Sequence, residues 1–440
     1  MTTPHDANTN QIANANLTFG QRIKSIVGGS AGNLVEYYDW YVYSAFTLYF
    51  APVFFPQSSG TIQLLQAAVI FALGFFMRPL GAWMMGIYSD RKGRKAGLTL
   101  SVALMSIGSL VIAFLPTYNS IGLIAPIILL IARLLQGLSL GGEYGASATY
   151  LSELATPKNR GFYASFQYIT LISGQLIALA VLLILQATLS KEDLQAWGWR
   201  IPFFIGAVLA ITVLWIRRNM IETEQSVAAQ KRGESKKSSA FALFKQYPKE
   251  ALKVFFLTAG GTLSFYAYTT YTQKFLVNTS GFSKETATEI NACAVLFFMI
   301  LQPIAGHLSD RFGKKVMITF FGIGGVLFTY PLFTMLSGTN NPYTAFFLIA
   351  AGLLITTGYT SINVIAKSEL FPAHIRSLGV ALPYALATSI FGGTTEAVGL
   401  LFKNFNFESG FYIYISAMIA ISAGTYIFTK NPEQLDKDKI

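Results

Sequence analysis

Long apolar segments alternate with short polar or charged segments along most of the chain. The hydrocarbon core of a bilayer is about 30 Å thick, so a helix needs roughly 20 apolar residues to cross it. Twelve segments reach this length, and several exceed it, which predicts tilted helices or helices that extend beyond the bilayer. The predicted spans lie near residues 23–50, 61–88, 96–116, 121–152, 161–189, 199–217, 250–279, 285–308, 315–336, 343–368, 376–402 and 408–429.

The composition favours an all-α membrane protein. Of the 440 residues, 53% are hydrophobic and only 12% are charged, where a soluble domain carries about 25% charged residues. A soluble protein this apolar would have too few polar side chains to cover its surface. The single cysteine, Cys293, excludes an intramolecular disulfide and a cysteine metal site, and we expect no metal and no cofactor. Residues 1–21 lack the features of a signal peptide and are expected to form a disordered tail.

The positive charges assign the two sides of the membrane. On a soluble protein the net charge of +11 would suggest nucleic acid, but here the placement of the charges argues against that partner. With a cytoplasmic N-terminus, 24 of the 32 Lys and Arg residues fall on the cytoplasmic side and four on the other side. This bias predicts that both termini are cytoplasmic. The remaining four cations fall inside predicted spans: Arg78, Arg133, Lys274 and Lys367.

The two halves of the chain repeat each other. The segment GIYSDRKGRK at Gly86–Lys95 recurs as GHLSDRFGKK at Gly306–Lys315, at an offset of 220 residues. A second repeat relates Glu153, Pro157 and Arg160 to Glu369, Pro372 and Arg376. We therefore expect two six-helix bundles that can rock about a central site, as in transporters. Their predicted limits are 22–217 and 250–430, with a cytoplasmic linker at 218–249 and a cytoplasmic tail at 431–440.

These repeated loops resemble the signature of the major facilitator superfamily, although Lys314 stands where the second copy of the signature has Arg. Further segments resemble its metabolite:proton symporter family, among them NLVEYYDWYVYS at Asn33–Ser44 and ARLLQGLSLGGEYGASATYLSE at Ala132–Glu153. Within that family the likeness is greatest to the bacterial carriers of 2-oxoglutarate (α-ketoglutarate). The resemblance implies proton-coupled uptake of 2-oxoglutarate across a bacterial inner membrane. Citrate, shikimate and betaine or proline remain alternative solutes.

The repeated loops also supply candidate gate residues. A carboxylate at a helix end can pair with nearby guanidinium groups and with the positive N-terminus of a helix from the other half. The resemblance implies that these residues hold the cytoplasmic side closed; the alternative is that the charges only fix the topology. The candidates are Gly86, Asp90, Arg91, Arg94, Glu153 and Arg160 in the first half, and Asp310, Arg311, Glu369 and Arg376 in the second.

The cations inside the spans are candidates for binding an anion. A charged side chain at the centre of a membrane helix costs about 2.5–3.5 kcal/mol, so each needs a partner or an aqueous cavity. Arg78 and Arg133 both fall near mid-membrane, where guanidinium groups suit a dicarboxylate. We expect them to share one chamber; the alternative is a structural ion pair. Lys274, Lys367, Tyr266 and Tyr271 are further candidates, although either lysine is near enough to a helix end to reach the membrane surface.

Glu36 and Asp39 are the candidates for proton coupling. Their i, i+3 spacing puts both carboxylates on one face of the first helix. Two carboxylates so close in an apolar region are not both ionised, so one of them can carry a proton. The alternatives are permanent pairing with an Arg, or hydrogen bonds from Asn33 and Tyr37. Glu143 and Glu396 could also carry a proton, or could instead bridge helices.

The sequence therefore predicts a proton-driven dicarboxylate importer. Each charge moved across 100 mV is worth about 2.3 kcal/mol, so uptake of a dianion into a negative-inside cell needs protons that move with it. The rivals are a membrane enzyme, for which the sequence offers no catalytic set, and a non-transporting nutrient sensor on the same fold. The expected partners are the solute, protons and the lipid bilayer, and the expected state is a monomer.

Overall fold

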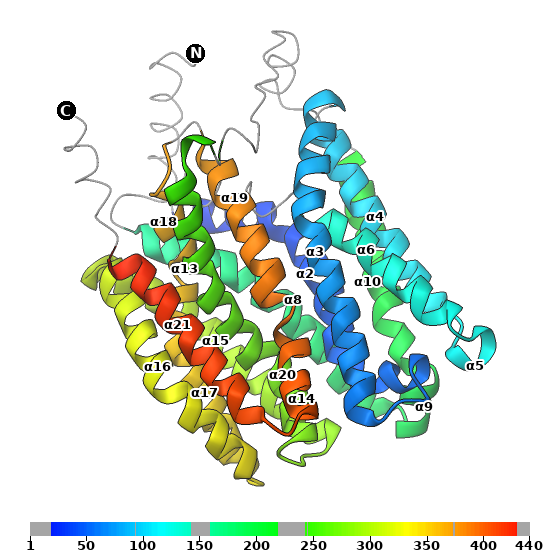
Figure 1. Cartoon of the computed structure of the whole chain (residues 1–440). Helices are drawn as coiled ribbons and strands as arrows, with labels where there is room; N and C mark the ends of the chain where they lie inside the picture. Colours follow the sequence, from blue (N-terminus) through cyan, green and yellow to red (C-terminus); the bar gives the residue numbers. More distant parts are fainter. Residues whose placement is uncertain are drawn as a thin grey trace, which may run out of the picture.

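The structure is a computed structural model, and it describes residues 19–92, 94–141, 159–218, 243, 245–372 and 375–428. All regular secondary structure in this part of the chain is helical. Figure 1 shows most helices of the first half, from blue α2 through cyan to green α10, on one side of the molecule and those of the second half, from green α13 to red α21, on the other. Helices α8 and α15 pack against each other between the two groups.

The first half contains six long helices, with short helical turns in the connections between them. The long helices are α2 (Phe19–Phe54), α3 (Gly60–Lys92), α4 (Arg94–Phe114), α6 (Ile124–Leu140), α8 (Arg160–Thr188) and α10 (Ile201–Arg218). The short turns are α5 (Tyr118–Ile121), α9 (Lys191–Ala196) and η1 (Gly198–Arg200).

The second half also crosses the molecule six times, but three of its passes are interrupted. The first pass consists of α13 (Pro248–Tyr266), the π-helical turn η2 (Ala267–Tyr271) and α14 (Thr272–Asn278). The fourth divides into α17 (Pro342–Thr360) and α18 (Asn363–Ser368), and the fifth into α19 (Arg376–Ala387), the π-helical turn η3 (Thr388–Gly392) and α20 (Thr395–Asn404). The uninterrupted helices are α15 (Lys284–Phe312), α16 (Lys314–Gly338) and α21 (Glu408–Ile427).

Helix ends follow local sequence signals. Ser283 caps α15 by accepting a hydrogen bond from the Thr286 N–H, and Asn341 caps α17 through Tyr343 and Thr344. Gly313 separates α15 from α16 at φ 91°, a conformation that favours glycine.

The helices match the twelve predicted spans in order, and residues 142–152 of the fourth predicted span lie outside the described residues. Seven are long and apolar enough to cross a membrane by length and composition, and three more are shorter apolar helices. The other two passes are the first of each half, α2 and α13–η2–α14. Both carry buried polar side chains, including Asp39 near the middle of the first and Lys274 four residues before the end of the second. The first helix of each half is therefore placed to form a polar site rather than to face lipid.

Candidate functional site

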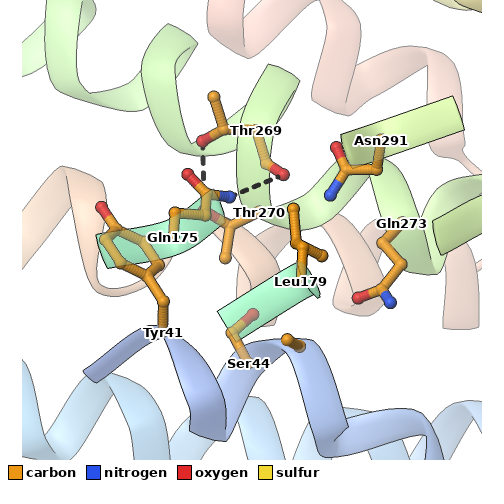
Figure 2. A pocket seen from close by; sticks show the side chains of 9 residues that line it. Tyr41, Ser44, Gln175, Leu179, Thr269, Thr270, Gln273 and Asn291 are labelled. Carbon is orange, nitrogen blue, oxygen red and sulfur yellow. Dashed lines mark hydrogen bonds between the residues drawn. The ribbon is translucent and has the colours of Figure 1, made fainter. Parts of the chain in front are cut away.

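A small cavity lies between the two halves (Figure 2). The first half contributes Tyr41, Ser44 and Ala45 of α2 with Gln175 and Leu179 of α8. The second half contributes Thr269, Thr270, Gln273 and Asn291. The Gln175 amide donates to the Thr269 carbonyl (3.2 Å) and joins the halves across the cavity. This lining can donate and accept hydrogen bonds, but none of its own side chains is charged.

A buried ion pair lies next to this cavity. The Lys274 Nζ is 3.1 Å from the Glu396 Oε1, and both side chains are almost fully buried. Ser44 donates to the same carboxylate oxygen (2.5 Å) and accepts from Lys274, whose Nζ also donates to the Ser44 carbonyl (2.6 Å). Lys274 thus points inward and binds α2 of the other half and α20, rather than reaching for the membrane surface.

Arg78 lies among tyrosine side chains from both halves. Its guanidinium group is buried, stacks over the Phe75 ring (5.0 Å) and interacts with the hydroxyls of Tyr37, Tyr41, Tyr266 and Tyr384. Tyr266 stacks on Tyr41, which lines the cavity. Among the described residues, no carboxylate lies within 4 Å of this guanidinium group. Two sequence candidates, Arg78 and Tyr266, are therefore brought together beside the cavity.

Lys367 is a second buried cation without a described acidic partner within 4 Å. Its Nζ donates to the Asn363 side chain (3.1 Å) and lies over the rings of Tyr384 (4.4 Å) and Tyr359 (5.3 Å). Tyr384 therefore stands between Lys367 and the Arg78 cluster. Tyr271, by contrast, packs against Phe275 and Phe411 and points away from the cavity towards α21.

Asp39 and Arg133 belong to one polar cluster inside the first half. The Gln136 amide donates to the Asp39 Oδ2 (2.5 Å) and accepts from the Arg133 Nη1 (2.6 Å). Ser109 donates to the other Asp39 oxygen, and the Arg133 guanidinium group stacks over Trp40 (4.1 Å) and Tyr43 (4.4 Å). All four polar side chains are fully buried. Gln136 thus separates the carboxylate from the guanidinium group, so their interaction passes through an amide.

The backbone fits closely around this cluster. A Cβ atom on Gly206 would lie 2.4 Å from the Asp39 Oδ1, and one on Gly108 would lie 2.6 Å from the Gln136 Cγ. Neither Asp39 nor Arg133 lines the cavity. The structure therefore separates Arg133, enclosed within the first half, from Arg78, which lies at the interface of the halves. Glu36, one turn before Asp39, is also buried.

Asp310 joins the two halves at the end of the molecule that carries the repeated loops, here called the motif end. Its carboxylate accepts hydrogen bonds from the backbone N–H groups of Gly161 (2.6 Å) and Phe162 (2.9 Å), at the N-terminus of α8. A carboxylate is stabilised there by the unpaired N–H groups and by the helix dipole. This contact is of the kind that the sequence analysis expected for a gate carboxylate.

Glu369 makes a second contact at the motif end. It binds Lys314 of its own half and lies 3.8 Å from Arg160 of the other half. Arg311 is exposed and stacks over Phe312. Glu153 lies outside the described residues, and so do the side-chain surroundings of Gly86, Asp90, Arg91, Arg94 and Arg376.

The opposite end of the molecule is also bridged. Lys284 of α15 donates to the Leu48 carbonyl of α2 (2.7 Å) and lies over the Tyr49 ring. Gln186 of α8 donates to the Tyr49 hydroxyl (2.7 Å) and to Thr288 (3.2 Å). The two halves therefore contact each other at both ends of the molecule, with the cavity between these contacts.

Several residues of this site were not among the sequence candidates, and they include Ser44, Ser109, Gln136 and Lys314. The sequence spacing could have identified Gln136, since it lies three residues after Arg133 and shares its helix face. Lys314 departs from the repeated motif in the sequence, and in the structure it donates a hydrogen bond to the Glu369 carboxylate. Ser44 and Ser109 carry no sequence signal, because their partners come from distant helices.

Comparison with known proteins agrees with this architecture. Residues 30–395 match the Major Facilitator Superfamily. The chain is 49% identical to the Alpha-ketoglutarate permease of Escherichia coli, over 91% of this chain and 92% of that protein. It is 32% identical to the Citrate-proton symporter of Salmonella typhi, over 94% of both chains.

A likeness to solved structures confirms the fold. The crystal structure of a D-xylose-proton symporter superposes with a TM-score of 0.74 at 19% identity, covering 94% of this chain and 99% of that one. The relatives are transport proteins rather than enzymes, as the sequence analysis expected. The chain belongs to the major facilitator superfamily of membrane transporters.

Proposed function

We propose that this protein is a proton-coupled symporter that imports 2-oxoglutarate across a bacterial inner membrane by alternating access. The observation that carries the proposal is the identity of 49%, over nearly the full length of both chains, with a permease for this solute. The Citrate-proton symporters are more distant, at 31–32% identity. This difference favours a small dicarboxylate over a tricarboxylate.

The charges around the cavity support a dianionic solute. 2-Oxoglutarate carries two carboxylates separated by three carbon atoms. Arg78 lies near Tyr41 of the cavity lining, and Lys274 donates hydrogen bonds to Ser44 and Thr270 of the same lining. Each carboxylate can then meet a cation from a different half, so that the bound solute itself draws the halves together. Lys367, beyond Tyr384, is a second cation from the second half that can approach Arg78 when the halves move.

The Asp39 cluster supports proton coupling. A carboxylate buried in an apolar region is costly as an anion, and its charge is offset here by Arg133 only through Gln136. A small movement of α2 against α6 would change that balance and with it the proton occupancy of Asp39. The proton would then bind and leave in step with the conformational change.

Transport by the purified protein in proteoliposomes tests this function. The labelled solutes are 2-oxoglutarate, citrate, shikimate, proline and glycine betaine, each with and without an inward proton gradient. We expect uptake of 2-oxoglutarate above its equilibrium level only with the gradient. Preferred uptake of another solute of the panel would refute the substrate, and gradient-independent accumulation would refute the proton coupling. A protein that transports none of them would instead fit a sensor.

A further inference from the structure

The Lys274–Glu396 pair is the most thoroughly buried ion pair among the described residues. The exposed fractions of the two side chains are 1% and 3%, against 21% or more for every partner in the other described pairs. The pair joins α14 to α20, and Ser44 connects both partners to α2 of the other half. The proton site described above does not use Glu396.

The pair lies within reach of a solute in the cavity. Ser44 and Thr270 both line the cavity, and the backbone carbonyl of each accepts a hydrogen bond from the Lys274 ammonium group. The ammonium group is therefore one hydrogen bond away from the cavity. A carboxylate that enters the cavity and displaces the Ser44 hydroxyl competes directly with Glu396 for Lys274.

Losing Lys274 to a solute would leave Glu396 as a buried anion with no cation to balance it. Lys274 is the only described cation within 4 Å of Glu396. The other titratable groups that face this carboxylate are Tyr43 of α2 and Tyr271 of η2, and Glu408 of α21 faces Tyr271 from the far side. None of these supplies a positive charge, and an unpaired buried carboxylate is strongly unfavourable.

We propose that Glu396 is a second proton site, which takes up a proton when a carboxylate of the solute takes its place on Lys274. The inference rests on the function proposed above and adds to it. In the empty carrier Lys274 is paired with ionised Glu396; in the loaded carrier Lys274 is paired with the solute, and Glu396 is neutral. The net charge of this buried site is the same in both states. When the solute leaves, Glu396 loses its proton to the side then open, and the ion pair forms again.

This site is separate from the Asp39 cluster but mechanically linked to it. Asp39, Tyr43 and Ser44 all lie on α2, where the Tyr43 ring contacts Arg133 and the neighbouring Ser44 donates a hydrogen bond to Glu396. A shift of α2 therefore acts on both carboxylates. Two proton sites, each engaged once per cycle, would balance the two charges of the dianion.

The test is the linkage between binding and protons in the purified full-length protein. Binding of 2-oxoglutarate is measured as a function of pH, together with the protons taken up from a weakly buffered solution. Each coupled proton changes the apparent Kd by about tenfold per pH unit. We expect the slope of log Kd against pH to be steeper by about one in wild type than in Glu396→Gln. Wild type should also take up about one more proton per bound solute than this variant. Glu408→Gln, at the more exposed Lys403–Glu408 pair, is the matched control and should behave as wild type.

The outcomes separate this inference from the proposed function. Equal slopes and equal proton uptake in wild type and Glu396→Gln overturn the second proton site while leaving 2-oxoglutarate transport intact. A folded Glu396→Gln that binds no solute also overturns it, because Glu396 would then be a structural bridge. If that variant does not fold, Asp39→Asn leaves Glu396 as the proposed proton site, and binding of the solute by Asp39→Asn without uptake of a proton is again fatal. Failure of wild type to bind 2-oxoglutarate refutes the proposed function itself.

Discussion

The halves approach each other closely at the motif end, where α8 crosses α15 at two glycines. A Cβ atom on Gly161 would lie 2.4 Å from the Gly306 carbonyl oxygen, and one on Gly306 would lie 2.5 Å from the Gly161 carbonyl oxygen. Both obstacles are backbone atoms, so no side chain can rotate away. We therefore predict that Gly161→Ala prevents full closure of the motif end.

The size of the effect follows from this geometry. Overpacking in a well-packed region typically costs about 1–3 kcal/mol. Because the clash exists only when the halves meet, this cost shifts the equilibrium between closed and open motif ends by roughly 5- to 150-fold. Gly161 is the second residue of α8, a helical position that alanine also adopts, so α8 itself should still form. The predicted defect is thus in closure rather than in folding.

Labelling of a reporter cysteine measures this equilibrium. Ser309 is buried on α15, one turn after Gly306 on the same helix face, so a cysteine there is accessible only when the motif end opens. In a background with Cys293 replaced by Ala, we expect a membrane-impermeant maleimide to label Ser309→Cys faster by the same factor in Gly161→Ala. Transport of 2-oxoglutarate should fall together with this change.

A matched glycine provides the control. Gly338 ends α16 and has no atom within 4 Å of a Cβ added to it, so Gly338→Ala should change neither labelling nor transport. If Gly161→Ala folds, labels at the wild-type rate and transports normally, the glycine contact does not hold the motif end closed.

Three further predictions concern single residues. Asp310→Asn weakens two charge-assisted hydrogen bonds to α8. The loss of about 0.5–2 kcal/mol should raise the rate of Ser309→Cys labelling roughly 2- to 30-fold. A labelling rate as in wild type would show that the carboxylate is dispensable. Gln136→Leu breaks the connection between Asp39 and Arg133, so gradient-driven accumulation should be lost while solute exchange in the absence of a gradient persists, and retained accumulation would contradict the Asp39 proton site. Arg78→Lys keeps the charge but loses the planar fork that binds carboxylates, so the KM for 2-oxoglutarate should rise at least about tenfold with little change in kcat; an unchanged KM would remove Arg78 from the solute site.

The sequence predicted the features that depend on local properties. The length of an apolar run is set by the bilayer, and so the predicted span 161–189 corresponds to α8 at Arg160–Thr188, and the span 408–429 to α21 at Glu408–Ile427. The contact of Asp310 with the other half was also predictable in kind, because a carboxylate at a helix end favours a helix N-terminus.

The sequence could not predict which charges meet. Lys274 and Glu396 are 122 residues apart, and their contact depends on how α14 and α20 pack across the π-helical turns η2 and η3. Arg78 and Arg133 look equivalent in the sequence, because each is a lone guanidinium group near mid-membrane. Packing makes them different, since Arg133 is enclosed by aromatic rings of its own half while Arg78 faces tyrosines of the other half.

Helix α8 contacts the second half at three levels, and this arrangement constrains how the carrier can move. Its N-terminus receives Asp310, its middle holds the Thr269 carbonyl through Gln175, and its far end reaches Thr288 through Gln186. A rigid helix cannot release its two ends by simple translation and keep the middle contact. The helix can release its two ends in turn by tilting about Gln175, because tilting opens the contacts at one end while it closes those at the other. The contacts at the two ends must then be of similar strength, since a much stronger closure at either end would hold the carrier in one state. Strengthening either end, as much as weakening it, should therefore slow transport.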